Sequence, residues 1–160
     1  LHMLTNILDE VSDINNDFKI TLWVYPHFKH NLFNDIKKKY KMNIKQQKGS
    51  SLCERMNNCL LLESSKHEKT ILIGSDIPSL TKGTIMNAKH ALLKKDVVIG
   101  PSIDGGFYLI GIKGQYKDFI DCMKTMDIQN VKNNIRSHSL DLELLTELKD
   151  IDKPEDLLVI

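Results

Sequence analysis

The stretch TILIGSDIPSL (residues 70–80) joins a short apolar run to a turn that carries a carboxylate. The run TILI is too short for a helix and holds no charged residue, which is typical of a strand buried on both faces. In the turn, Gly74 permits a close backbone approach and Pro78 stiffens the chain. The stretch therefore predicts a buried strand whose tip presents Asp76.

Helical and strand patterns alternate around this stretch. Apolar residues recur at helical spacing in several segments, which predicts helices over residues 4–14, 28–40, 51–64, 81–93, 116–123 and 128–137. Short β-rich or apolar runs predict strands at residues 19–25, 44–46, 70–73, 97–99 and 107–112. Such alternation implies right-handed crossovers and a mostly parallel sheet with helices on both faces. We expect one three-layer α/β/α domain over residues 1–160.

The composition is that of an ordinary globular domain. Hydrophobic residues make up 41% and charged residues 27% of the 160 residues, enough for one core. Lys and Arg number 22 against 21 Asp and Glu, which argues against a dedicated nucleic-acid binder. No apolar run approaches the roughly 18 residues of a membrane helix. The three cysteines form no CxxC pair, so we expect free thiols and a cytoplasmic location.

Asp76 is the first candidate functional residue. In open α/β sheets, ligands bind beyond the carboxyl ends of the strands. A carboxylate at that place suits Mg²⁺ or Mn²⁺, which bridge carboxylates to diphosphate oxygens. The alternative is an Asx turn, in which Asp76 bonds its own backbone ahead of the next helix. The stretch alone leaves both interpretations open.

The segment GPSIDGGFYLIG (residues 100–111) places a second carboxylate between two predicted strands. Asp-Gly followed by an alternating run favours a plain β-hairpin. In the functional interpretation, Gly105 and Gly106 let the backbone pass close to a ligand, and Asp104 is a second acidic group. If both acidic loops end strands of one sheet, they are expected to converge.

Two further segments allow both a structural and a functional interpretation. QQKGSSLCERM (residues 46–56) predicts a helix capped at Ser50 or Ser51, with Arg55 on its first turn. Its loop could instead offer amide groups to a base or an anion, with Arg55 meeting a phosphate. DIDKPEDL (residues 150–157) reads as a helix start with Asp152 as N-cap, or as a late acidic ligand.

Taken in order, QKGSSLCERM, GSDIPSLT, VVIGPSIDGGFYLIGI and DIDKPEDL resemble a family of GT-A-type proteins. That family is described as glycosyltransferase-like, or as rSAM/selenodomain-associated transferases. The similarity runs from about residue 47 to residue 157. It implies the fold of the nucleotide-diphospho-sugar transferase superfamily, which also includes nucleotidylyltransferases of cofactor biosynthesis.

The resemblance also implies roles for individual residues. Asp76 matches the metal-binding acid of the superfamily, with Asp104 and Asp152 as further acidic positions around Mg²⁺ or Mn²⁺. The Asp104, Gly105 and Gly106 loop matches the family's loop on the acceptor or sugar side, whereas Gln47, Gly49 and Arg55 match the loop and helix that flank the nucleotide. On this basis our candidate catalytic groups are Asp76, Asp104 and Arg55, and our candidate binding positions are Gln47, Gly49, Ser75, Gly105 and Gly106.

One element of the family has no counterpart in the sequence. Members normally begin with a strand and a basic, glycine-containing loop that cradles the nucleotide phosphates, and no stretch here matches that loop. We therefore expect the N-terminal strand and phosphate loop to be missing, as in a truncated chain, a fragment or an inactive relative. A sheet edge exposed in this way would favour a homodimer.

The leading functional hypothesis is a metal-dependent, glycosyltransferase-like protein that uses a nucleotide-activated sugar and a small-molecule acceptor. The alternatives are a nucleotidylyltransferase of the cofactor-biosynthesis type and a degenerate GT-A domain that binds without turnover. Nucleic acid is not an expected partner.

Overall fold

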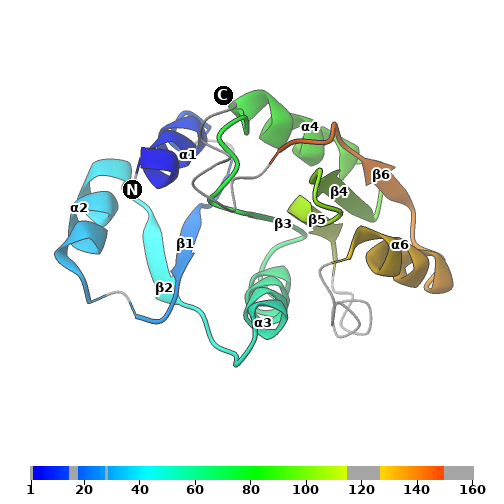
Figure 1. The fold of residues 1–160 in the computed structure, drawn as a ribbon, viewed down its shortest axis with the longest axis horizontal. Helices are drawn as coiled ribbons and strands as arrows, with labels where there is room; N and C mark the ends of the chain where they lie inside the picture. Colours follow the sequence, from blue (N-terminus) through cyan, green and yellow to red (C-terminus); the bar gives the residue numbers. More distant parts are fainter. Residues whose placement is uncertain (1, 15–17, 28, 115–126, 150–160) are drawn as a thin grey trace.

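The computed structural model describes residues 2–14, 18–27, 29–114 and 127–149 of the chain (Figure 1). These ranges hold five helices: α1 (His2–Ser12), α2 (Asn31–Tyr40), α3 (Leu52–Ser64), α4 (Lys82–Ala91) and α6 (Ile128–Ser137). They also hold six strands: β1 (Thr21–Val24), β2 (Asn43–Gln46), β3 (Lys69–Ile73), β4 (Val97–Pro101), β5 (Phe107–Lys113) and β6 (Leu142–Leu144). The α/β fold predicted from the alternating pattern is confirmed.

Four strands form the main sheet, in the order β3-β5-β4-β6. β5 lies antiparallel to both of its neighbours, whereas β6 runs parallel to β4. β3, β4 and β6 therefore share one direction, and the sheet is mostly parallel with β5 reversed. β4 and β5 form a hairpin, so the structural interpretation of the GPSIDGGFYLIG segment is correct.

Helices cover both faces of this sheet, with α1 and α4 above the strands and α3 and α6 below them in Figure 1. Successive residues of β4 point to opposite faces. Val98 packs in one core with residues of α1, α2 and α4, whereas Val97 and Ile99 pack in a second core with residues of α3 and α6. All three side chains are fully buried. The two cores on opposite faces give the expected three layers.

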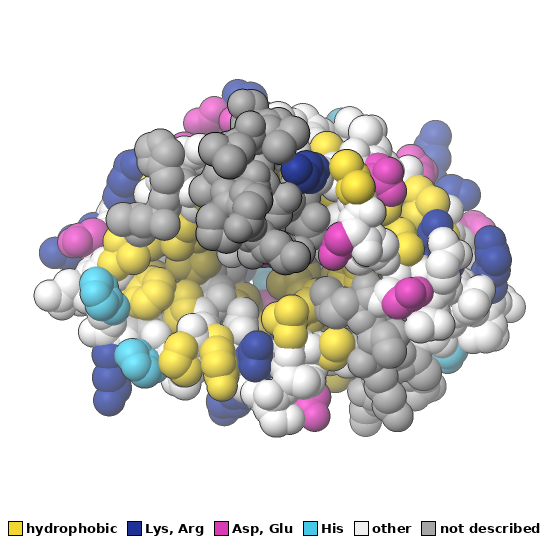
Figure 2. Space-filling model, viewed as in Figure 1, with side chains coloured by type: hydrophobic (Ala, Val, Ile, Leu, Met, Phe, Trp, Pro, Cys, Tyr) yellow, Lys and Arg dark blue, Asp and Glu magenta, His cyan; other side chains and the backbone are white. Residues whose placement is uncertain are grey.

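β1 and β2 form a separate parallel pair. Among the described residues, β1 and β3 each have a strand neighbour on one side alone. The sequence predicts that β3 is buried on both faces, and this prediction is wrong. Every residue of β3 is half-buried. An edge strand lacks the cover that a neighbour would supply. The face drawn in Figure 2 is hollowed near its centre, and hydrophobic side chains lie beside the hollow.

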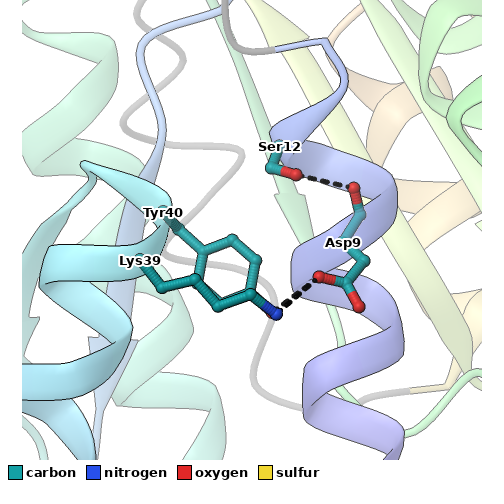
Figure 3. A network of polar contacts seen from close by, with 4 residues as sticks. All are labelled: Asp9, Ser12, Lys39 and Tyr40. Carbon is teal, nitrogen blue, oxygen red and sulfur yellow. Dashed lines mark hydrogen bonds and ion pairs between the residues drawn. The ribbon is translucent and has the colours of Figure 1, made fainter.

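A polar network ties α1 to α2, as Figure 3 shows. The Tyr40 hydroxyl donates to Asp9 Oδ1 at 2.7 Å, and Lys39 Nζ donates to the same oxygen at 3.1 Å. The ion pair is exposed at both ends, so solvent screens it and it contributes little to stability by itself. The Tyr40 residue is 5% exposed and anchors the contact in the first core.

Several element boundaries differ from those predicted. β1 begins at Thr21 and α2 at Asn31, where His30 serves as N-cap by accepting from the Leu32 N–H at 3.1 Å. The short strand β6 is not predicted by the sequence pattern. The predicted helix at residues 116–123 and the DIDKPEDL segment lie outside the described residues.

Candidate functional site

The turn that carries Asp76 follows β3 directly. The Gly74 N–H donates to the Tyr108 carbonyl at 2.9 Å, and the Leu80 N–H donates to the Ile77 carbonyl at 3.1 Å. Ile77 and Leu80 are each 2% exposed and pack in the first core. Both ends of the turn are therefore fixed to the sheet and to the core below it.

The Asp76 side chain itself is not fixed. It makes no hydrogen bond or ion pair to any other described residue, and it is exposed, as is Ser75. The Asx turn that the sequence left open is thus not formed. Within the described part of the chain, both carboxylate oxygens of Asp76 are open to a ligand.

The loop that carries Asp104 joins β4 to β5. The Ser102 hydroxyl donates to Asp104 Oδ1 at 2.6 Å, and the Gly106 N–H donates to the same oxygen at 2.9 Å. Gly105 has a φ of +91°, a conformation that glycine adopts without strain. The loop is therefore a compact turn built around one carboxylate oxygen.

Both acidic loops lie at the same edge of the sheet. β3 and β4 are parallel and flank β5, so their carboxyl ends meet at one edge. Gly74 bonds to Tyr108, while Pro101 pairs with Phe107 on the other side of the same strand. The expected convergence of the two loops on one edge is confirmed by this register.

Asp104 is held in its ionised form. The Ser102 hydroxyl, and then the Gly106 N–H, lower the pKa of this carboxyl below its ordinary value because both donors favour the charged state. A carboxylate with a lowered pKa is a poor proton acceptor near neutral pH. Asp104 is thus better suited to bind a cation or to orient a hydroxyl than to act as a general base.

The Gln47–Arg55 region forms a tight loop against the start of α3. Ser51 is the N-cap and accepts from the Glu54 N–H at 3.2 Å, while Glu54 accepts from the Ser50 N–H at 2.7 Å. This reciprocal capping confirms the helix start that the sequence predicts. Gly49 has a φ of +137°, and a Cβ there would lie 2.8 Å from the backbone nitrogen of Arg55. Only glycine fits at this place.

The Gln47 amide is turned toward β1. Its Nε2 donates to the Trp23 carbonyl at 3.2 Å. One of the two amide hydrogens is therefore used inside the protein, and the second hydrogen and the oxygen are left for a base. This narrows the role that the resemblance implies for Gln47.

Arg55 is half-buried. Its guanidinium carbon lies 4.0 Å from the centre of the Tyr25 ring, and its Nε atom is buried without a hydrogen-bond partner. Tyr25 is 55% exposed, so the stacked pair reaches the surface. No described hydrogen bond or ion pair joins this pair to Asp76 or Asp104.

The sequence did not single out Tyr25, Ser102 or Tyr108. Ser102 stands two residues before Asp104, a spacing at which a hydroxyl can bond the next acidic side chain. Tyr108 is 3% exposed, and its hydroxyl donates to the Thr146 carbonyl at 2.9 Å. That contact joins residues far apart in sequence, so no local pattern reveals it.

The donor set at this edge suits a hard divalent cation. No group of three His, Cys, Asp or Glu residues among the described parts of the chain could hold a metal by itself. Mg²⁺ is commonly bound by one or two carboxylates plus substrate phosphates and waters. Asp76 and Asp104 fit that pattern. Asp152, the third acidic position that the resemblance implies, lies outside the described residues.

A cavity of about 560 Å³ lies elsewhere, between α4 and β6. Its lining includes His90, Lys94, Lys95 and Glu143 but none of the candidate site residues. The candidate site is therefore an open sheet edge and not this cavity. Within the described residues, no helix is long and apolar enough to cross a membrane.

Comparison with known proteins agrees with this architecture. A family model described as an uncharacterized protein conserved in bacteria (DUF2064) matches residues 11–128. A provisionally assigned nucleotide-diphospho-sugar transferase from Desulfovibrio desulfuricans G20 has a similar structure, with a TM-score of 0.82 and 24% identity over 95% of this chain and 68% of that chain. No curated protein matches the sequence.

Two other solved structures share the fold. The 4-diphosphocytidyl-2C-methyl-D-erythritol synthase of Anaerococcus prevotii DSM 20548 has a TM-score of 0.75 and 13% identity, over 98% of this chain and 86% of that chain. Molybdopterin-guanine dinucleotide biosynthesis protein A from Archaeoglobus fulgidus has a TM-score of 0.53 and 11% identity, over 96% and 82%. The expected nucleotide-diphospho-sugar transferase fold is confirmed, whereas the narrower rSAM-associated resemblance stays a prediction.

Proposed function

This chain belongs to the DUF2064 family, and we propose that it is a metal-dependent transferase that acts on a nucleotide-activated sugar. One observation carries the proposal. Asp76 and Asp104 end two parallel strands at one edge of a sheet whose fold is that of nucleotide-diphospho-sugar transferases. In open α/β sheets this edge is where ligands bind.

The two carboxylates have different parts in this proposal. Asp76, which has no partner among the described residues, would hold the cation. Asp104, already ionised and oriented by Ser102 and Gly106, approaches the site through its remaining oxygen. Bound Mg²⁺ or Mn²⁺ would supply positive charge against the diphosphate of the leaving nucleotide.

The glycines and Arg55 have supporting roles. Gly105 and Gly106, together with Ser75, leave the edge uncovered, so that a sugar or phosphate can approach the backbone. Arg55 could bind an anionic group of the donor through the guanidinium nitrogens that Tyr25 does not cover. No described contact links Arg55 to the acidic edge, the edge of the sheet that carries Asp76 and Asp104. The role of Arg55 is therefore less directly supported than the roles of the two carboxylates.

Nucleotidylyl transfer is the second candidate. It is favoured by the similarity to 4-diphosphocytidyl-2C-methyl-D-erythritol synthase, a structure that covers nearly the whole chain. In that reaction the donor is a nucleoside triphosphate and pyrophosphate leaves. The released product separates the two reactions. Nucleotidylyl transfer releases pyrophosphate from a nucleoside triphosphate, whereas sugar transfer releases a nucleoside diphosphate from a nucleotide-sugar.

Calorimetric titration tests the proposal directly. UDP, GDP, CDP and their sugar conjugates are titrated into the protein with and without Mn²⁺. We expect binding of at least one of them to require the metal. Asp76→Asn should abolish that requirement together with tight binding, because a neutral amide does not replace an anionic ligand.

The matched control is Asp35→Asn, which removes an exposed carboxylate from α2. It should leave the isotherms unchanged. If no nucleotide binds in either condition to a chain with a cooperative unfolding transition, the proposal is wrong and a non-catalytic domain becomes the better description.

A further inference from the structure

Ser102 is one of two buried serines among the described residues, at 3% exposure. It follows β4 directly, and its hydroxyl makes the short 2.6 Å bond to Asp104 Oδ1. The second donor to Asp104, the Gly106 N–H, reaches the same atom. Oδ2 receives no hydrogen bond from the described residues. The carboxylate is therefore bound on one side alone.

The backbone around Ser102 is fixed by hydrogen bonds from three directions. Within the loop, the Ser102 N–H donates to the Gly106 carbonyl at 3.1 Å. From the segment after β6, the Leu148 carbonyl accepts from the Ile103 N–H at 3.1 Å. From the start of α6, the Ile128 N–H donates to the Gly105 carbonyl at 3.0 Å. Ser102 is thus a donor of fixed position.

A fixed donor restricts the acceptor. If Asp104 rotates about its Cα–Cβ bond, Oδ1 leaves both donors, and a buried hydroxyl is left without its partner. The rotamer seen in the structure is therefore strongly favoured, and it leaves Oδ2 as the oxygen that the Ser102 and Gly106 donors do not occupy. Asp76 has no comparable restriction among the described residues.

We propose that Ser102 is a positioning residue that holds Asp104 in one orientation, so that Asp104 presents Oδ2 alone to the ligand of the acidic edge. The orientation follows from the hydrogen bonds that Ser102 and Gly106 donate to Asp104 Oδ1. The nature of the ligand rests on the proposed function. The competing interpretation is that Ser102 only stabilises the hairpin, without any consequence for the carboxylate.

Scalar couplings between the Asp104 side-chain carboxyl carbon and the backbone measure the orientation in the metal-free protein. Wild type should show couplings of a single χ1 rotamer, and Ser102→Ala should show averaged values. Ser102→Thr, which keeps the hydroxyl, should restore a single rotamer. Ser64→Ala is the matched control because Ser64 is the other buried serine, 4% exposed and bonded to the Leu61 carbonyl at 3.3 Å. An unchanged single rotamer in Ser102→Ala overturns the proposal.

Mn²⁺ titration tests the consequence. Removing a hydrogen-bond partner of a metal-ligating carboxylate typically lowers metal affinity about 10-fold or more. We therefore expect about that loss in Ser102→Ala, recovery in Ser102→Thr and no loss in Ser64→Ala, with thermal midpoints as the check on folding. Equal affinity in wild type and Ser102→Ala contradicts the positioning role. If wild type binds no Mn²⁺ with or without nucleotide, the proposed function fails, and the couplings still decide whether Ser102 orients Asp104.

Discussion

The two acidic loops at the sheet edge hold their carboxylates in opposite ways. The Asp104 loop closes on itself, and two donors fix one carboxylate oxygen. The Asp76 turn is anchored through its backbone and through Ile77, while the Asp76 side chain has no partner among the described residues. One carboxylate is thus ordered when the chain folds, and the other is left to be ordered by a ligand.

This difference has an energetic meaning. Ordering a side chain costs conformational entropy, about 0.5–1.5 kcal/mol for a flexible side chain immobilised in an interface. The Asp104 side chain loses this entropy when the chain folds, whereas the Asp76 side chain loses it when a ligand binds. A site with one preformed and one adaptable carboxylate can orient a ligand and still adjust to it. The predictions below test the contrast, beginning with Gly100 in β4 and ending with Gly74, which follows β3.

Gly100→Ala should have the largest effect. A Cβ at this position would lie 2.3 Å from Cζ and 2.7 Å from the hydroxyl oxygen of Tyr108. Tyr108 is 3% exposed and is bonded through its hydroxyl to Thr146, so the ring cannot move aside freely. We expect the free energy of unfolding to fall by about 3 kcal/mol, the upper part of the range for overpacking. Urea denaturation measures it.

Gly83→Ala is the control for this substitution. The nearest atom to a Cβ at Gly83 is the Thr81 hydroxyl at 3.5 Å, an ordinary contact. Because Gly83 is the second residue of α4, alanine should be tolerated there and should stabilise the protein by less than about 0.5–1 kcal/mol, the gain expected in the middle of a helix. If both variants are equally stable, Gly100 does not pack against Tyr108 as closely as the structure shows.

Asp104→Ala and Asp76→Ala should separate the two loops. The first removes two hydrogen bonds to a charged oxygen and leaves the buried Ser102 hydroxyl without its acceptor. Since the carboxylate is exposed, we expect a loss of about 1–2 kcal/mol in the free energy of unfolding. The second removes no described contact and should change stability by less than about 0.5 kcal/mol. Equal losses would contradict the contrast.

The pH dependence of the free energy of unfolding, compared between wild type and Asp104→Ala, gives a further test of the Asp104 loop. The pKa of Asp104 is lowered in the folded state from its ordinary value of 3.8. The stabilisation is therefore complete above pH 3.8 and is lost as the pH falls through the folded pKa. The difference between wild type and Asp104→Ala should be constant at neutral and mildly acidic pH and should shrink below pH 3.8. A difference that grows in acid would mean that the donors do not favour the charged carboxylate.

The sequence predicts much of the Asp76 side of this comparison and less of the Asp104 side. TILI followed by GSDIP predicts both the strand and the carboxylate at its tip, because both signals are local. The hairpin at residues 100–111 is also local, and DGG predicts it. What fixes Asp104 is partly distant, since Leu148 and Ile128 hold the loop from other segments. A periodicity argument carries no information about such contacts.

Two other features escaped prediction for similar physical reasons. β6 has three residues, too few to show a period, and it is a strand because it pairs with β4. β3 looks like a central strand in the sequence but is half-buried, because neighbours in a sheet are set by the whole topology.

Gly74→Ala should have the smallest effect on stability and is the finest test of the contrast. A Cβ there would lie 3.0 Å from Asp76 Oδ1, which is the far end of an exposed side chain and can rotate away. The backbone of Gly74 lies outside the left-handed region, so alanine fits it. We expect the free energy of unfolding to stay within about 0.5 kcal/mol of wild type, while the Asp76 carboxylate takes another orientation. The Mn²⁺-dependent nucleotide isotherm should therefore change in this variant although the unfolding curve does not. A large loss of stability would show that the Asp76 side chain is held as firmly as Asp104, and the two loops would then not differ in kind.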